Sequence, residues 1–310
     1  MIQKKTNMPG FIFGLLAAAC WGGGTVISKS SLDSFPPIPL LIIQLSASVI
    51  LLWLVVFFKK IKLLKPGEIL KFAWLGFLEP YMAYILILFG LTTVKSGEAV
   101  LIQSLESIMI VVAGFVLYKN RPHAKFLIMS MVALLGVYLS LELAPEDEAF
   151  INSGGLILIA LGTLIAAVYV VLSSRLAISV DAAYVVACQH SVALFFALLM
   201  IPFEWSGFFI EFYSNLSFGI WCLAILSGVV QYALAFTFYT MALKKISANV
   251  AGMLLGFVPI FGIAGGGIFL QEAISQQQLI GVSIAIIAIV YIGFLGDGSE
   301  AVQDVVLTDK

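Results

Sequence analysis

The feature that most constrains this chain is a series of ten apolar segments, separated by short stretches rich in Pro, Gly or charged residues. Each segment has roughly the 20 residues that an α-helix needs to cross the hydrocarbon core of a bilayer. Hydrophobic residues make up 62% of the 310 positions and charged residues 11%, a balance that argues against a soluble globular protein. We therefore predict an all-α integral membrane protein with ten transmembrane helices. The predicted helices cover residues 11–30, 38–58, 69–91, 96–117, 123–141, 154–177, 181–203, 217–242, 247–270 and 275–296.

Positively charged residues are distributed unevenly between the connections. If the N-terminus lies in the cytoplasm, fourteen of the sixteen Lys and Arg residues lie on that side, and only Lys29 and Lys95 lie outside. Such a bias sets the orientation because cationic loops resist translocation. We therefore predict a multi-pass protein of the cytoplasmic (inner) membrane with both termini in the cytoplasm. An outer acidic loop is expected to contain Glu142, Glu146, Asp147 and Glu148.

An internal repeat is visible when the chain is shifted by 152 positions. Each half then holds five helices, and because five is odd, the second half enters the membrane from the opposite side. Inverted repeats suit alternating access, in which a midplane site opens to either side in turn. The proposed units are a first repeat at 1–148, a second repeat at 149–296 and a cytoplasmic tail at 297–310. The identical pairs are Ala83 with Ala235, Leu91 with Leu243, Ala99 with Ala251, Ile108 with Ile260, and Gly114 with Gly266.

No pattern typical of a metal or cofactor site is found in the sequence. Cys20, Cys188 and Cys222 lie in apolar segments without metal-ligand spacing, and His123 and His190 are distant from each other. His190 could relay protons or form a packing hydrogen bond within the seventh segment. The connections are too short for a soluble catalytic domain, so the function is expected within the helix bundle.

Two carboxyl groups lie deep in the predicted helices. Glu79 is in the third segment, and Glu106 is near the middle of the fourth. A charged residue at the centre of a bilayer costs about 2.5 to 3.5 kcal/mol, so such groups usually face a cavity or a partner on another helix. They can bind protons or anchor a substrate amine, or they can be protonated groups that join neighbouring helices. Gln231, the shifted counterpart of Glu79, places a long polar side chain at an equivalent depth.

The fourth segment is expected to carry three polar side chains on one broad face. With about 100° per residue, Glu98, Gln103 and Glu106 project at about 0°, 140° and 80°. Glu98 is nearer the outer end, where a solvated or interfacial role is at least as consistent with its position as substrate binding.

Short motifs in several segments match a known pattern. Trp21-Gly22 is followed by Lys29 in the first segment, and Ala242-Leu243-Lys244 leads into the ninth. Further motifs are Gly256-Phe257-Val258-Pro259-Ile260, Phe269-Leu270-Gln271-Glu272 and Gln278-Leu279-Ile280-Gly281. These residues resemble the EamA family of the drug/metabolite transporter superfamily, whose members have ten helices in two repeats. The resemblance implies a central cavity lined by helices 1, 3, 4, 6, 8 and 9, with helices 5 and 10 at the periphery. This chain departs from the pattern at Ser107, which stands where the second half has Pro259 and which follows Glu106.

Aromatic side chains lie on the helices that the resemblance directs to the cavity. They could stack on rings or surround an ammonium group, or they could be packing and interfacial residues. These residues are Trp21, Tyr81, Tyr84, Tyr169, Tyr232 and Tyr239.

Together these features predict a secondary transporter for a small amine-containing metabolite, such as an amino acid. Acidic groups without a deep Lys or Arg fit cationic or zwitterionic substrates, and the resemblance favours export. The alternatives are an uptake or exchange carrier for a cationic metabolite or drug, an intramembrane enzyme using Glu79 and Glu106, and a receptor subunit. Expected partners are a small-molecule substrate, the lipid bilayer and protons, without cofactor, metal or nucleic acid, in a monomer or a homodimer. The candidate residues for substrate binding or proton coupling are Glu79, Glu106, Gln231, Tyr232, Trp21, Tyr84, Gln103 and Glu98.

Overall fold

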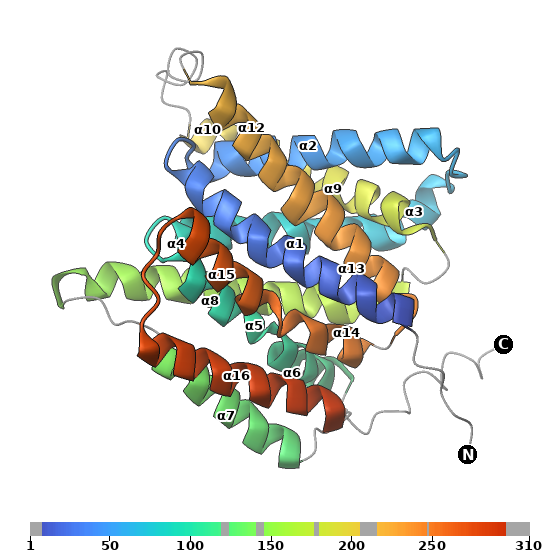
Figure 1. Ribbon diagram of the computed structural model, residues 1–310. Coiled ribbons are helices and arrows are strands. Elements are labelled where there is room, and N and C mark those ends of the chain that lie inside the picture. Colours follow the sequence, from blue (N-terminus) through green and yellow to red (C-terminus); the bar gives the residue numbers. More distant parts are fainter. Residues whose placement is uncertain are drawn as a thin grey trace, which may run out of the picture.

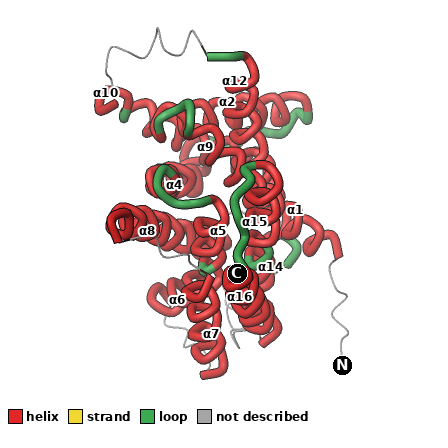
Figure 2. Tube along the Cα trace, turned by 60° about the vertical axis from the view of Figure 1, so that its left-hand side comes forward, coloured by secondary structure: helices red, strands yellow, loops and turns green. Residues whose placement is uncertain are grey.

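The computed structural model describes residues 8–118, 124–140, 146–176, 180–204, 216–246 and 248–295. Within these ranges the regular structure is entirely helical, and the helices pack side by side (Figures 1 and 2). Helical segments lie at all ten predicted positions, which confirms the prediction of a ten-helix apolar bundle. Seven helical stretches of the described ranges are long and apolar enough to cross a membrane, and three apolar helices are shorter.

The first and second predicted segments correspond to α1 Met8–Leu32 and α2 Pro37–Phe58. The third consists of four consecutive elements, α3 Pro66–Ala73, η1 Trp74–Phe77, η2 Leu78–Met82 and α4 Ala83–Leu91. The fourth consists of α5 Ser96–Ser104 and α6 Glu106–Tyr118, and the fifth is α7 Ala124–Ser140. The sixth segment is α8 Glu146–Leu176, and the seventh consists of α9 Ala182–Leu199 and the short α10 Ile201–Glu204. The eighth consists of α12 Phe218–Ser227, η3 Gly228–Leu234 and α13 Ala235–Leu243. The ninth consists of α14 Ala248–Leu255 and α15 Val258–Phe269, and the tenth is α16 Gln276–Leu295.

Four of the ten segments have interruptions that recur at equivalent places in the two halves. The π-helical turns η2 and η3 contain Glu79 and Gln231, which are 152 positions apart. The break at Leu105, between α5 and α6, is likewise 152 positions before Phe257, which lies between α14 and α15. These paired irregularities support the internal repeat more strongly than the few identical residues do.

The periphery of the bundle is formed by α7 and α16, which pack along each other (Figures 1 and 2). These are the fifth and tenth segments, so their position agrees with the arrangement that the family resemblance implies. The site must therefore lie among the other helices.

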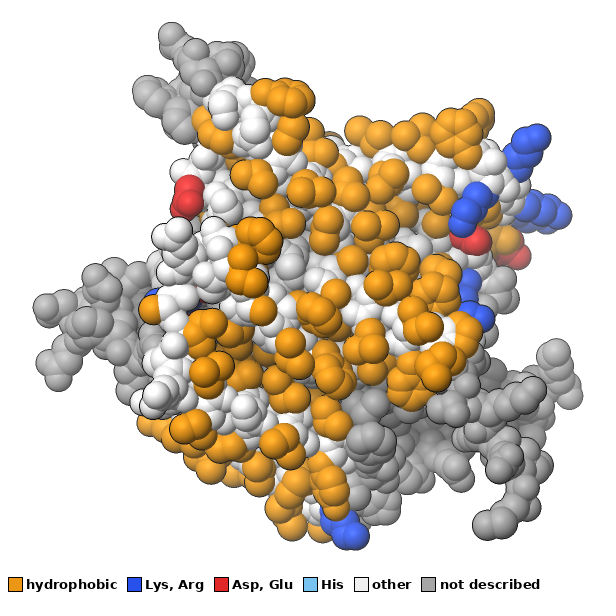
Figure 3. All heavy atoms as spheres, viewed as in Figure 1, with side chains coloured by type: hydrophobic (Ala, Val, Ile, Leu, Met, Phe, Trp, Pro, Cys, Tyr) orange, Lys and Arg blue, Asp and Glu red, His pale blue; other side chains and the backbone are white. Residues whose placement is uncertain are grey.

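The outer surface is apolar, as a lipid-facing surface requires. Figure 3 shows hydrophobic side chains over most of the visible face and Lys or Arg side chains mainly at its right-hand edge. Phe57 and Phe58, at the end of α2, are each 75% exposed, and Phe218 is 84% exposed. The connection that follows α2 carries four exposed cations, Lys59, Lys60, Lys62 and Lys65.

The predicted outer acidic loop is wrong in part. Glu146, Asp147 and Glu148 belong to α8, which begins at Glu146 instead of near residue 154. Glu142, His123 and the proposed tail at 297–310 lie outside the described residues.

Candidate substrate-binding site

A narrow cavity lies at the centre of the bundle, between α1, the third and fourth segments, α8 and the α14–α15 pair. Five of the sequence-predicted residues line it: Trp21, Glu79, Tyr84, Gln103 and Glu106. The remaining lining residues are Ile87, Thr163, Ala166, Leu255 and Val258. Helices 1, 3, 4, 6 and 9 therefore contribute directly, and helix 8 lies behind this layer.

The two carboxyl groups reach the cavity because their helices are interrupted. Glu79 precedes Pro80 and has extended backbone angles, φ −143° and ψ 127°. Pro80 lacks an amide hydrogen and disfavours helical angles at the residue before it. Glu106 is the first residue of α6, directly after the break at Leu105. Both carboxyls line the same cavity and interact electrostatically with each other.

Equivalent positions of the two repeats face each other across the cavity, but their chemistry differs. Gln103 corresponds to Leu255 and Glu106 to Val258, each pair being 152 positions apart. The first half thus supplies polar side chains where the second half supplies apolar ones. A ligand in this cavity meets one polar and one apolar side.

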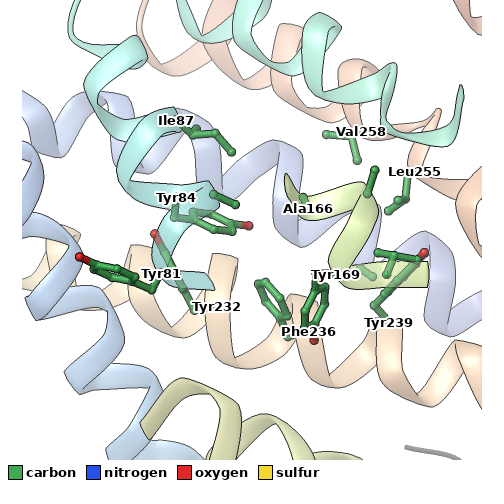
Figure 4. Packing of buried hydrophobic residues seen from close by; sticks show 14 of the residues in the cluster. Tyr81, Tyr84, Ile87, Ala166, Tyr169, Tyr232, Phe236, Tyr239, Leu255 and Val258 are labelled. Carbon is green, nitrogen blue, oxygen red and sulfur yellow. The ribbon is translucent and has the colours of Figure 1, made fainter. Parts of the chain in front are cut away.

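Aromatic rings form a continuous layer beside the carboxyls (Figure 4). Phe236 is at its centre, with the ring of Trp21 at 5.3 Å and that of Tyr84 at 6.0 Å. Trp21 also packs edge-on against Tyr239 at 5.2 Å, and Tyr84 lies 4.5 Å from Tyr232. The sequence interpretation missed Phe236, although it is the shifted counterpart of Tyr84.

Tyr81 and Tyr169 take up different positions in this layer. Tyr169 packs 6.1 Å from Phe236 and donates a hydrogen bond to Gln189, at 2.8 Å. Tyr81 points away from the rings in Figure 4 and packs against Phe77 and Phe196. Tyr81 therefore belongs to a separate aromatic contact.

Gln231 and Tyr232 do not line the cavity. The Gln231 side chain accepts a hydrogen bond from Ser28 at 2.5 Å and donates one to Thr25 at 3.3 Å. Gln44 extends this network by donating to Ser28 and to Ser227, both at 2.8 Å. Gln231 thus joins η3 to α1, while the ring of Tyr232 supports Tyr84 from behind.

His190 is fully buried in α9 and is hydrogen-bonded. Its Nδ1 lies 2.7 Å from the Ser48 hydroxyl on α2, and its ring packs edge-on against Phe236 at 4.9 Å. Of the two roles left open by the sequence, this geometry supplies the packing hydrogen bond.

Glu98 is buried but is not among the cavity-lining residues. It lies near Lys29, whose ammonium donates a 2.6 Å hydrogen bond to the backbone carbonyl of Leu91 at the end of α4. The expected single polar face of the fourth segment is therefore divided: Gln103 and Glu106 face the cavity, and Glu98 lies with a cation. Glu98 and Gln103 both lie in the continuous helix α5, where they project about 140° apart, so they can face different neighbours; the break at Leu105 changes the direction of Glu106 alone.

Ser107, the departure from the family pattern, connects the two repeats. Its hydroxyl donates a 2.7 Å hydrogen bond to the backbone carbonyl of Gly252 in α14. This contact holds the first turn of α6 against α14. Because Glu106 precedes Ser107 in that turn, the contact helps to position the Glu106 carboxyl.

Comparison with known proteins identifies the family. The family model described as EamA-like transporter family matches residues 8–141 and 153–294, which together span nearly the whole chain. The chain belongs to the EamA-like transporter family. The matched segments are two repeats, and this EamA-like protein is accordingly a multi-pass membrane protein of the drug/metabolite transporter superfamily.

Similar proteins agree with this assignment. An uncharacterized transporter of Bacillus subtilis (strain 168), YetK, is 23% identical over 293 residues, which cover 92% of this chain and 87% of that protein. A crystal structure described only as that of a protein superposes with a TM-score of 0.68 at 18% identity and covers 92% of this chain and 98% of that one. The latter likeness establishes the fold alone. The family description and the name of the relative both indicate a transporter and not an enzyme.

Proposed function

We propose that this EamA-like transporter moves a small amine-containing metabolite, such as an amino acid, out of the cell by alternating access. The observation that carries the proposal is the pair Glu79 and Glu106 beside an aromatic layer in a central cavity. Among the described residues that line this cavity none is Lys or Arg. Carboxylates and aromatic faces both attract an ammonium group, whereas an anionic substrate would need cationic partners.

Proton coupling is part of the proposal. A carboxyl group away from bulk water has its charged form disfavoured, so Glu106 can exchange a proton for a bound ammonium group. Two carboxyls in one small space also repel each other when both are ionised, which favours one proton on the pair. Binding of the substrate cation would then release that proton.

The proposed movement uses two inverted halves, 1–148 and 149–296. The paired interruptions at η2 and η3, and at Leu105 and Phe257, are located where irregular backbone lines or adjoins the cavity. Broken helices beside a midplane site are the usual arrangement in transporters built from repeats.

The test is Glu106→Gln in proteoliposomes. This change keeps the size of the side chain but fixes it neutral, so insertion should survive. If Glu106 couples protons, exchange of a labelled amine substrate continues while accumulation against its gradient, driven by a pH difference, falls at least tenfold. If Glu106 instead holds the substrate, exchange is lost as well.

The matched control is Glu98→Gln, which neutralises a buried carboxyl of the same segment outside the cavity and should preserve the ratio of accumulation to exchange. Wild-type behaviour of Glu106→Gln in both assays would contradict the proposed role. If the proteoliposomes instead move the substrate, or a cationic drug, preferentially in the direction that corresponds to entry into the cell, the uptake carrier would be favoured.

A further inference from the structure

The cavity contains hydrogen-bond donors that no protein group satisfies. Trp21 Nε1 and Gln103 Nε2 are both enclosed by protein and have no hydrogen-bond partner. The Tyr84 hydroxyl is the nearest protein group that interacts with the indole N–H, but the pair does not have full hydrogen-bond geometry. An indole N–H and an amide N–H₂ can only donate, so these atoms call for an acceptor.

Two further polar atoms without a partner belong to the aromatic layer beside the cavity, although their residues do not line it. The hydroxyls of Tyr232 and Tyr239 are buried and make no hydrogen bond. In Figure 4 the Tyr239 ring lies at the same end of the aromatic layer as Leu255, one of the lining residues. A buried polar group without a partner is costly, and such groups collected around one cavity are typical of a binding site.

The donors and the carboxyls line one narrow cavity. Gln103 is in the last turn of α5 and Glu106 begins α6, directly after the break at Leu105, while Trp21 lines the cavity from α1. The edge-on contacts with Phe236 and Tyr239 fix the Trp21 ring, so that its N–H has a defined position. The cavity therefore offers anionic acceptors and neutral donors together.

We propose that Trp21 Nε1 and Gln103 Nε2 bind the carboxylate of a zwitterionic amino acid whose ammonium group is held by Glu79 and Glu106. This inference rests on the proposed function and narrows it, because a simple amine would leave both donors unsatisfied. Sites built to hydrogen-bond a substrate group discriminate strongly against analogues without that group. Trp21 and Gln103 are thus specificity-determining residues.

The experiment measures binding to the purified full-length protein, by calorimetry or ligand-induced thermal stabilisation. The probes are the twenty standard L-amino acids, each compared with its decarboxylated amine and its methyl ester. For any amino acid that binds, the wild-type protein should prefer it over both analogues by about tenfold or more. Binding assays are needed because neutral amines cross bilayers unaided.

Two variants separate the ends of the ligand. Trp21→Phe keeps an aromatic ring but removes the N–H, and Gln103→Leu keeps the approximate size but removes the amide. Each should weaken binding of the amino acid about tenfold and weaken binding of the amine by a clearly smaller factor. Retained amine binding also demonstrates that the variant is folded. Thr237→Val is the control, since it removes a buried, unpartnered hydroxyl on α13 that is not among the cavity-lining residues.

The outcomes distinguish this inference from the proposed function. Equal binding of amino acids, esters and amines by the wild-type protein, or equal loss for all three in the variants, would overturn carboxylate recognition and leave amine transport standing. Failure of every amino acid and amine to bind would overturn both.

Discussion

At the scale of single residues, the site depends on small positions as much as on its carboxyls. Gly22, next to Trp21, lies against the backbone of α15: a Cβ atom there would fall 2.5 Å from the carbonyl oxygen of Val258 and 2.8 Å from the amide nitrogen of Gly262. The neighbouring Gly23 has open space at the corresponding point. The absence of a side chain at Gly22 therefore allows α1 to bring Trp21 toward the cavity wall formed by Val258.

We expect Gly22→Ala to destabilise the protein by about 1 to 3 kcal/mol, because backbone atoms cannot yield as a flexible side chain can. Gly23→Ala should be neutral or stabilising by up to about 1 kcal/mol, since Ala is the better helix former. Thermal unfolding of the two purified variants in the same detergent measures the difference. A lower transition temperature for Gly23→Ala than for Gly22→Ala would show that the packing of α1 on α15 is not the cause.

Sequence reasoning identified the cavity-lining residues for which the depth along a helix, or a family motif, was sufficient evidence. Glu79, Glu106 and Trp21 are examples, because depth in the membrane and a family motif were sufficient. Gln231 could not be placed in this way, since its partners Ser28 and Thr25 are 203 and 206 positions away. Long-range contacts of this kind arise from packing, which periodicity does not describe.

At the scale of elements, the ends of helices are joined by specific hydrogen bonds. The Glu272 carboxylate accepts from the backbone N–H and the hydroxyl of Ser96, at 3.0 and 2.8 Å, and from the N–H of Gly97 at 3.3 Å. These groups form the first turn of α5, where the helix dipole favours a negative charge. The segment after α15 thereby caps a helix of the other repeat.

Glu272→Gln should weaken this cap and lower the free energy of unfolding by about 1 to 3 kcal/mol, because a charged acceptor is replaced by a neutral amide. Glu68→Gln provides a comparison: Glu68 accepts a 3.4 Å hydrogen bond from the Lys65 N–H at the exposed start of α3. Its loss should cost about 0.5 kcal/mol or less. Equal effects in chemical or thermal unfolding would contradict a special role for the cap between repeats.

The helix interruptions show where sequence reasoning stops at this scale. Pro259 lies at the start of α15, and the ninth segment is interrupted just before it, at Phe257, because a proline within a helix removes a backbone hydrogen bond. The break at Leu105 and the π-helical turn of Gly228–Leu234 contain no proline. Their position follows from the repeat, in which the equivalent element of the other half carries the proline.

At the scale of the whole molecule, contacts divide the helix ends into two groups. Near the lysine-rich connection after α2, the N–H of Leu64 is bonded to the Tyr184 hydroxyl at the start of α9. Lys29, Leu91, Ser96 and Glu272 are joined at other helix ends, by the contacts described above. The ten-helix scheme assigns the first group to the cytoplasm and the second to the outside.

The predicted orientation can be tested by reporters whose activity depends on the side of the membrane. A reporter in the Lys59–Lys71 connection and one after Lys310 should both be cytoplasmic, because cationic connections resist translocation. A reporter between α7 and α8 should be external, since an odd number of helices separates that connection from the N-terminus. If the first two reporters were on opposite sides, an odd number of spans would lie between them. That result would contradict the ten-helix scheme and the inverted repeat. The same location for all three would leave the bundle intact but exclude the five-plus-five topology, because an odd number of crossings between the α2–α3 and α7–α8 connections is what places the two halves in opposite orientations.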